Sequence, residues 1–391
     1  VTDYTMSEII ASVYEVMERT GIPRGILFLD EINCVSETLV PAMLQFLQFK
    51  TFGRHRLPKG WILIAAGNPP EYNRSAREFD VVTWDRVRRM DIEPDLTAWN
   101  QYMAEKSLHP AIHSYLIQKP DRFYRIRRTA DGTGFVTARG WSDLSGMLTA
   151  MEDAGLKPDQ DLVCQYLQEA ETAGDFFSFY RLFMKYRDDY QIDRILGGTE
   201  DRMIRERAAA APFDERIRIL AMLNGALSKG FREVVREDDV LGLIYESLVR
   251  IREGEEITSV LTDAEKSLER QQILGGPESF RAVRERERTA FLREMKDYSD
   301  GRMKFERRIA ALDQRAGVEG AKLAAVFSFA EAAWGEGQEM LLLLSELTAD
   351  PYSSGFIGLY GSPEYGRHCE KLAFSERGSG IRKEIRELRA L

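Results

Sequence analysis

The sequence predicts a two-part fold class, an α/β core followed by all-α structure. Two short apolar runs near the N-terminus, RGILFLDEIN and WILIAAGN, are typical of buried strands, and the helical stretch ETLVPAMLQFLQF lies between them. Two apolar strands separated by a helix imply a βαβ unit and a mainly parallel sheet. After about residue 95 the strand signals nearly disappear, and from Gly140 onward one helical pattern follows another.

The remaining elements follow from local patterns. Residues 5–20 have helical periodicity, and Gly21 and Pro23 end that helix. KTFGRHRLPKG has the Gly and Pro punctuation of a hairpin before the second strand, and RFYRIRRTADGTGFVTARG predicts a short ribbon. One aromatic series predicts the core face of a helix: Phe176, Phe177, Phe179, Tyr180 and Phe183.

Three domains are predicted. Residues 1–95 form a partial α/β core, residues 96–170 a helical lid, and residues 171–391 a larger all-helical domain. Val1 is not an initiator residue and the chain opens close to an amphipathic helix, so we expect a segment upstream of the printed sequence.

Composition excludes several classes of protein. Apolar residues make up 44% and charged residues 30%, which is ordinary for a globular chain. A net charge of −9 argues against nucleic acid or anionic lipid as a partner. Three isolated cysteines fit the reducing cytoplasm. No apolar run approaches the length of a membrane span and no signal peptide is visible, so no membrane partner is expected.

Two carboxylates follow the first apolar strand. Asp30 and Glu31 stand at its C-terminal end, the edge of an open α/β sheet where ligands bind. An acid pair there suits a nucleotide site, in which Asp30 could hold Mg²⁺ and Glu31 could orient and deprotonate a water molecule. The alternative is a plain strand end. Cys34 follows closely, but it has no basic partner in the sequence and is predicted to be a buried structural thiol.

The second strand ends in a polar residue at the corresponding point. Asn68 follows WILIAAG, and a neighbouring strand would set its amide beside the acid pair. From there it would reach a γ-phosphate or the attacking water. Gly-Asn-Pro-Pro is also strong turn chemistry, and a terminating turn is compatible with the site.

At this point the sequence resembles the AAA+ ATPases, and within them the MoxR group. LFLDE is similar to the Walker B motif, Asn68 to the sensor-1 asparagine, and KTFGRHRLPKG to the pre-sensor-1 hairpin of that clade. FDVVTWDRVRRMDIEPD resembles the arginine-finger segment, with Arg86 at the matching position, and FVTARGWSDL resembles the start of the sensor-2 helix, with Arg139 in that role. The resemblance covers roughly residues 1–170.

The arginines have an alternative interpretation. Arg86, Arg88 and Arg89 form a cluster near Asp85 and Asp91, which could be local ion pairing. An arginine is nonetheless a suitable donor for transition-state charge on phosphate, because it is planar, always protonated and bidentate. The resemblance implies that Arg86 reaches a neighbouring subunit's nucleotide and that Arg139 acts within its own subunit. Arg88 and Arg89 could share the finger role.

One motif of the family is absent. A P-loop requires Gly-x-x-x-x-Gly-Lys-Ser/Thr, and no glycine in this sequence is followed by lysine. We interpret the fold as a truncated P-loop-type core and expect these residues alone to bind ATP poorly and not to hydrolyse it.

The resemblance implies an ATP- and Mg²⁺-dependent ATPase that remodels or matures a partner protein. It also implies a homo-oligomeric ring, expected to be a hexamer, and a client that carries a von Willebrand factor A domain. The alternative function is a non-hydrolysing interaction scaffold whose helical domain is the binding module. A P-loop upstream would favour the ATPase, and its absence from the intact gene would favour the scaffold.

Overall fold

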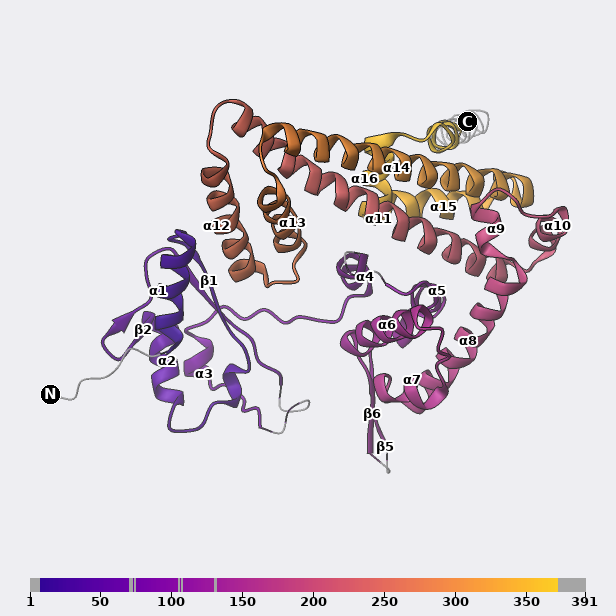
Figure 1. The fold of residues 1–391 in the computed structure, drawn as a ribbon. Helices are drawn as coiled ribbons and strands as arrows, with labels where there is room; N and C mark the ends of the chain where they lie inside the picture. Colours follow the sequence, from indigo (N-terminus) through magenta and orange to yellow (C-terminus); the bar gives the residue numbers. More distant parts are fainter. Residues whose placement is uncertain are drawn as a thin grey trace, which may run out of the picture. The chain divides into compact units, whose positions relative to one another are not determined.

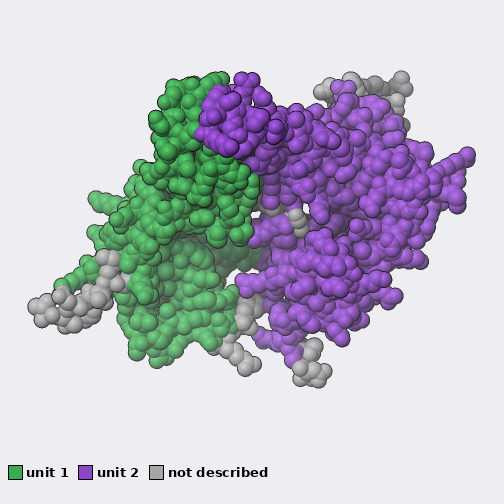
Figure 2. Space-filling model, viewed as in Figure 1, with its two compact units in different colours: residues 1–93, 250–295 green, residues 94–249, 296–391 purple. Residues whose placement is uncertain are grey.

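The computed structural model describes residues 8–371, except 70–72, 74, 105, 107, 130 and 131. The chain divides into two compact units, which Figure 2 colours separately. The first contains residues 1–93 and 250–295, and the second contains residues 94–249 and 296–391. The described part is mostly helical and includes three two-stranded sheets.

The first unit contains the parallel strands and the helices that cover them (Figure 1). Its elements from the N-terminal segment are α1 (Glu8–Thr20), β1 (Gly25–Leu29), the 3-10 turn η1 (Ile32–Cys34), α2 (Val40–Phe49), β2 (Thr51–Phe52), β3 (His55–Arg56), β4 (Trp61–Ala65) and α3 (Val81–Trp84). Two later helices belong to the same unit, α12 (Ile257–Gly275) and α13 (Phe280–Glu294). The predicted first helix, both strands, the intervening helix and the hairpin are confirmed.

Strands β1 and β4 pair in parallel and are joined by a crossover through α2, as the βαβ pattern predicts. Their register runs from Gly25 opposite Trp61 to Leu29 opposite Ala65. At this end of the ladder, Gly25 leaves room for the Trp61 ring, which lies against it. A Cβ added to Gly25 would stand 2.8 Å from that ring.

One face of the β1–β4 sheet forms the core of the first unit. Leu27, Leu29 and Leu63 pack against a cluster from α1, η1 and α2 that contains Ile10, Ile32, Met43 and Phe46. Ile10, Met43 and Phe46 are buried because the apolar stripes of both helices face the sheet, and Ile32 of η1 is buried beside them.

The opposite face of this sheet is apolar and exposed. Ile26, Phe28 and Ile62 are 59%, 57% and 58% exposed. The prediction of two buried strands is therefore wrong for this face. The physical reason is that α1 and α2 cover only the side that carries the leucines. The apolar runs in the sequence predicted burial of both sides. Parallel sheets in α/β proteins are ordinarily covered on both faces.

Residues 250–295 bring a distant part of the chain into the first unit. Helices α12 and α13 pack along each other, and Glu269 of α12 accepts a hydrogen bond from Arg19 of α1 at 2.9 Å. The sequence assigned this segment to the C-terminal helical domain. The predicted boundary at residues 95/96 lies close to the unit boundary at 93/94, whereas the one at 170/171 does not coincide with a division between compact units.

The second unit begins with a group of helices and the predicted ribbon. Its first elements are α4 (Leu96–Ala104), α5 (Pro110–Gln118), η2 (Pro120–Arg122), β5 (Arg125–Thr129), β6 (Gly132–Val136), α6 (Ala138–Asp153), α7 (Gln160–Tyr166) and α8 (Ala170–Asp189). An aromatic cluster of Tyr115, Trp141 and Phe176 joins α5, α6 and α8, with ring centroids 5.2–5.7 Å apart. Phe176, Tyr180 and Phe183 are buried on α8, as the sequence predicts, whereas Phe177 and Phe179 of the same predicted series are half-buried.

The rest of the second unit is built on two long helices. Its elements are α9 (Ile192–Leu196), α10 (Arg202–Ala210), α11 (Phe213–Arg252), α14 (Tyr298–Trp334), α15 (Gln338–Ala349) and α16 (Pro351–Tyr360), and α11 ends just inside the first unit. Phe231 of α11 stacks on Phe356 of α16 with centroids 4.2 Å apart. No helix in the described ranges is both long enough and apolar enough to cross a membrane.

Candidate functional site

The carboxyl ends of β1 and β4 bring the predicted acid pair and Asn68 together. Because these strands are parallel and in register, Asp30 and Glu31 leave the sheet at the same edge as Asn68. The ladder continues past the strands, where Ala66 N donates to Leu29 O at 2.8 Å and Ile32 N donates to Ala66 O at 3.0 Å. This edge is where open α/β sheets bind ligands.

Glu31 has an unusual backbone conformation for its residue type. Its φ of 52° and ψ of 38° lie in the left-handed region, which costs energy for a residue with a Cβ. The conformation turns the chain from β1 into η1. The Asp30 Oδ1 atom accepts a hydrogen bond from the Glu31 backbone N–H at 2.9 Å, which supports the turn.

Three donors surround the Glu31 carboxylate. Asn68 Nδ2 donates to Oε1 at 2.9 Å, and Cys34 Sγ and Asn73 Nδ2 donate to Oε2 at 3.0 and 3.3 Å. These hydrogen bonds, the one from Cys34 foremost, hold the pKa of Glu31 below its ordinary value. The carboxylate is therefore ionised and oriented at neutral pH, as a group that accepts a proton from water must be.

Cys34 differs from its predicted role as a buried structural thiol. It is partly exposed, and its Sγ lies between Glu31 and the Asn73 amide, whose Nδ2 is 3.2 Å away. The hydrogen bond to Glu31, partial burial and the negative charge of that carboxylate all raise the pKa of Cys34. The thiol consequently stays protonated and acts as a hydrogen-bond donor.

Asp30 is exposed and is suited to hold a hard cation. Its second carboxylate oxygen has no hydrogen-bond partner among the residues that the structure describes. The described residues also contain no group of three His, Cys, Asp or Glu side chains that could hold a metal. Mg²⁺ is typically bound through one or two carboxylates together with water and substrate phosphates, and Asp30 fits that mode.

Arg86 lies just after α3, on a segment anchored to α2. Its Nε donates to Gln48 Oε1 at 2.8 Å, and its backbone N–H donates to Thr83 O at 3.1 Å. Asp80 caps α3 by accepting from Thr83 N at 2.8 Å, and hydrogen bonds from Thr83 together with the charge of Arg86 lower the pKa of Asp80.

Arg89, three residues after Arg86, forms a local ion pair. Local ion pairing was the alternative interpretation of this arginine cluster in the sequence. Its Nε lies 2.8 Å from Asp91 Oδ1, and its guanidinium lies 4.9 Å from the centre of the Trp84 ring. Arg86 hydrogen-bonds to Gln48, on a helix that packs against the β1–β4 sheet.

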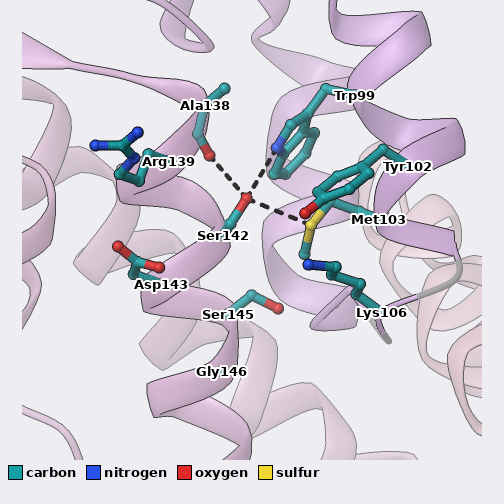
Figure 3. A pocket seen from close by; sticks show the side chains of 10 residues that line it. All are labelled: Trp99, Tyr102, Met103, Lys106, Ala138, Arg139, Ser142, Asp143, Ser145 and Gly146. Atoms are coloured by element: carbon teal, nitrogen blue, oxygen red, sulfur yellow. Dashed lines mark hydrogen bonds between the residues drawn. The ribbon is translucent and has the colours of Figure 1, made fainter. Parts of the chain in front are cut away.

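Arg139 belongs to the second unit, in the first turn of α6. Thr137 caps this helix by accepting from Gly140 N at 3.2 Å. Arg139 is exposed, and its side chain has no hydrogen-bond or ion-pair partner within the described part of the chain. It lines a pocket of about 520 Å³ between α4 and α6 (Figure 3). There the Ser142 hydroxyl accepts from Trp99 Nε1 at 3.0 Å and donates to Ala138 O at 2.9 Å.

Sequence reasoning missed two residues of this site, Asn33 and Asn73. Asn33 follows the acid pair by two residues, and its buried amide donates to the backbone of Asn68. Asn73 is the next asparagine after Asn68 and reaches back to Glu31. The only signal in the sequence was three asparagines close to the two strand ends, which turn chemistry also explains.

Comparison with known proteins adds no family to this description. No protein-family model matched the chain, and neither a curated protein nor a solved structure matched it.

Proposed function

We propose that this chain carries the hydrolytic half of an ATPase site of the AAA+ type, closest in its motifs to the MoxR group. Glu31 would orient and deprotonate the attacking water, Asn68 would contact that water or the γ-phosphate, and Asp30 would hold Mg²⁺. When bound, Mg²⁺ would neutralise charge on the phosphates, and ATP would supply the phosphoryl group.

One observation carries the proposal. The Asn68 amide donates to the Glu31 carboxylate at 2.9 Å across two neighbouring parallel strands. A strand-terminating turn alone requires no such contact, and a plain strand end does not require a carboxylate in the left-handed conformation. Backbone strain held in place by surrounding hydrogen bonds is typical of functional sites.

The other roles proposed for this protein follow from its resemblance to the AAA+ ATPases. Arg86 is proposed to act on the nucleotide of a neighbouring subunit in a ring, expected to be a hexamer, and Arg139 to act as the sensor-2 arginine. The sequence contains no phosphate-binding loop, so hydrolysis requires a loop supplied from outside these residues. Further α/β structure would also cover the exposed Ile26, Phe28 and Ile62. We expect a cytoplasmic location and a protein client, with a von Willebrand factor A domain as the first to test.

A scaffold without hydrolysis is the second candidate, and the long helices favour it. Helices α11 and α14 contain 40 and 37 residues, which corresponds to roughly 60 and 55 Å of rigid rod. Such rods suit the display of binding surfaces and need no nucleotide.

The two candidates differ in the effect of Glu31→Gln in the protein encoded by the intact reading frame. The substitution keeps the shape of the side chain and removes the proton acceptor. If the proposal is correct, the variant binds ATP with near wild-type affinity and does not hydrolyse it, whereas the wild type turns ATP over in the presence of Mg²⁺. Equal hydrolysis by both proteins would refute the role of Glu31, and a reading frame without a P-loop would favour the scaffold.

A further inference from the structure

Asn33 is a buried side chain that holds two segments of the site at once. It lies in η1 and is 9% exposed. Its Nδ2 donates to Asn68 O at 2.7 Å and to Arg77 O at 3.3 Å. One amide group thus joins the loop that carries Asn68 to a segment that arrives nine residues later in the chain.

The backbone of Asn33 reinforces this connection. Asn33 O accepts from Arg77 N at 3.1 Å, so Arg77 is held by both its N–H and its carbonyl. The preceding residue, Ile32, donates its N–H to Ala66 at 3.0 Å. The η1 turn is consequently tied to β4 on one side and to Arg77 on the other.

The connection continues from Arg77 toward Arg86. Three residues after Arg77, Asp80 caps α3 by accepting from the N–H of Thr83 at 2.8 Å and from its hydroxyl at 2.7 Å. The Arg86 N–H then donates to Thr83 O at 3.1 Å. Residue 77 is thus linked to Arg86 through the short segment that leads to Asp80, through the Asp80 cap and through Thr83.

Gly67 has no side chain, and this leaves the space that the Asn33 side chain occupies. An added Cβ at Gly67 would stand 2.3 Å from Asn33 Oδ1 and 2.8 Å from its Cγ. The Oδ1 atom is buried and has no donor among the described residues. An unpaired buried acceptor is unfavourable for folding, so packing alone does not explain an asparagine here. The two donor contacts of its Nδ2 do explain it.

We propose that Asn33 is a positioning residue that couples the Asn68 amide to the segment carrying Arg86. This inference rests on the proposed function for its catalytic meaning, because Asn68 and Arg86 are the groups that would contact the phosphates. Through Asn33, the loop that senses the γ-phosphate and the arginine that acts on the neighbouring subunit move together.

The coupling can be tested without nucleotide in the 391-residue chain. We would label asparagine and arginine with ¹⁵N and follow the Asn68 side-chain amide and the Arg86 Nε–H, which donates to Gln48. Asn68→Asp and Arg86→Lys identify the two resonances by removing them. Asn33→Ala should move both, whereas Thr38→Ala, an exposed substitution in the loop before α2, should move neither.

A second variant keeps the test valid if Asn33→Ala disturbs folding. In Asn33→Asp the ionised acid faces the Asn68 and Arg77 carbonyl oxygens, while the protonated acid can donate to one of them. As the pH is lowered, both resonances should therefore return toward the positions that the wild type shows at the same pH, a reference that removes the effect of Glu31 protonation on the Asn68 amide. If Arg86 is unmoved while Asn68 shifts, or if lowering the pH restores neither resonance, the coupling is refuted.

In the protein encoded by the intact reading frame, Asn33→Ala should lower kcat by about 10²-fold, the scale of a small misplacement of catalytic groups, with little change in KM for ATP. Failure of the proposed function is a separate outcome. In that case Glu31→Gln would leave hydrolysis unchanged, while the resonances would still report whether Asn33 couples the two segments.

Discussion

The contact between Gly67 and Asn33 supports a quantitative prediction for Gly67→Ala. The new Cβ would stand 2.3 Å from Asn33 Oδ1, so one of two adjustments must follow. If Asn33 stays in place, the overpacked contact costs about 1–3 kcal/mol. If Asn33 swings away, it loses its hydrogen bonds to Asn68 O and Arg77 O, at about 0.5–1.5 kcal/mol each. Either way the free energy of unfolding of the first unit falls by about 1–3 kcal/mol.

The assay is a double-mutant cycle of Gly67→Ala and Asn33→Ala, in which stability is measured only in the first unit. Hydrogen exchange of peptides that cover β1 and β4 reports the opening free energy of this unit, without assuming that both units unfold together. In an Asn33→Ala background the atoms that clash are gone, so Gly67→Ala should there cost no more than about 0.5 kcal/mol. The expected coupling energy, which is the difference between the two costs, is therefore about 0.5–3 kcal/mol.

A helical glycine in open space provides the matched control. Gly242 lies inside α11, and an added Cβ there meets nothing within 4 Å. Gly242→Ala should stabilise its helix by about 0.4–1 kcal/mol and leave exchange in β1 and β4 unchanged. Equal costs of Gly67→Ala in the two backgrounds would show that Asn33 is not the group that excludes a side chain at position 67.

Three further predictions address the rest of the chain. Burial alone would raise the pKa of Glu152, but its hydrogen bonds with His109 and Tyr180 and the charge of Arg187 outweigh burial and lower it. A lowered folded-state pKa stabilises the protein above the unfolded value and ceases to do so as the pH falls through the folded value. Glu152→Gln should therefore reduce the unfolding free energy of the second unit by about 1–3 kcal/mol at pH 7, and the difference should narrow below about pH 4 in chemical denaturation. Arg86→Ala in the intact protein should leave ATP affinity nearly unchanged and lower turnover by about 10³-fold or more. Mixing that variant with Glu31→Gln subunits should restore part of the turnover, and no recovery in proven mixed oligomers would contradict action between subunits. Asp30→Asn should weaken only the Mg²⁺-dependent part of ATP binding, as measured by titration with and without the metal, and an equal loss in both conditions would argue against a role as a metal ligand.

Local patterns in the sequence were sufficient for the elements of the N-terminal region. The apolar runs around Leu27 and Leu63 predicted both strands, and the intervening helix predicted their parallel pairing. The meeting of Glu31 with Asn68 followed from the same reasoning, because parallel strands end at a common edge. These predictions depend on short-range periodicity and chain direction, and both can be obtained from the order of the residues alone.

Contacts between distant residues were decided only by the tertiary structure. Exposure of Ile26 and Phe28 could not be read from an apolar run, because burial depends on which helices cover each face. The assignment of residues 250–295 to the first unit, marked by the Arg19–Glu269 pair, depends on packing across more than two hundred residues.

The amino-acid sequence by itself determined which polar groups stand at the ends of β1 and β4, since strand direction and residue order fix that edge. Only the tertiary structure decided how those groups are held. Asn33 and Asn73 carry no local signature beyond turn chemistry, and their roles arise from hydrogen bonds that span 35 to 44 residues. Such bonds join segments that the packing of α1 and α2 against the sheet holds near each other, so a linear pattern does not encode them.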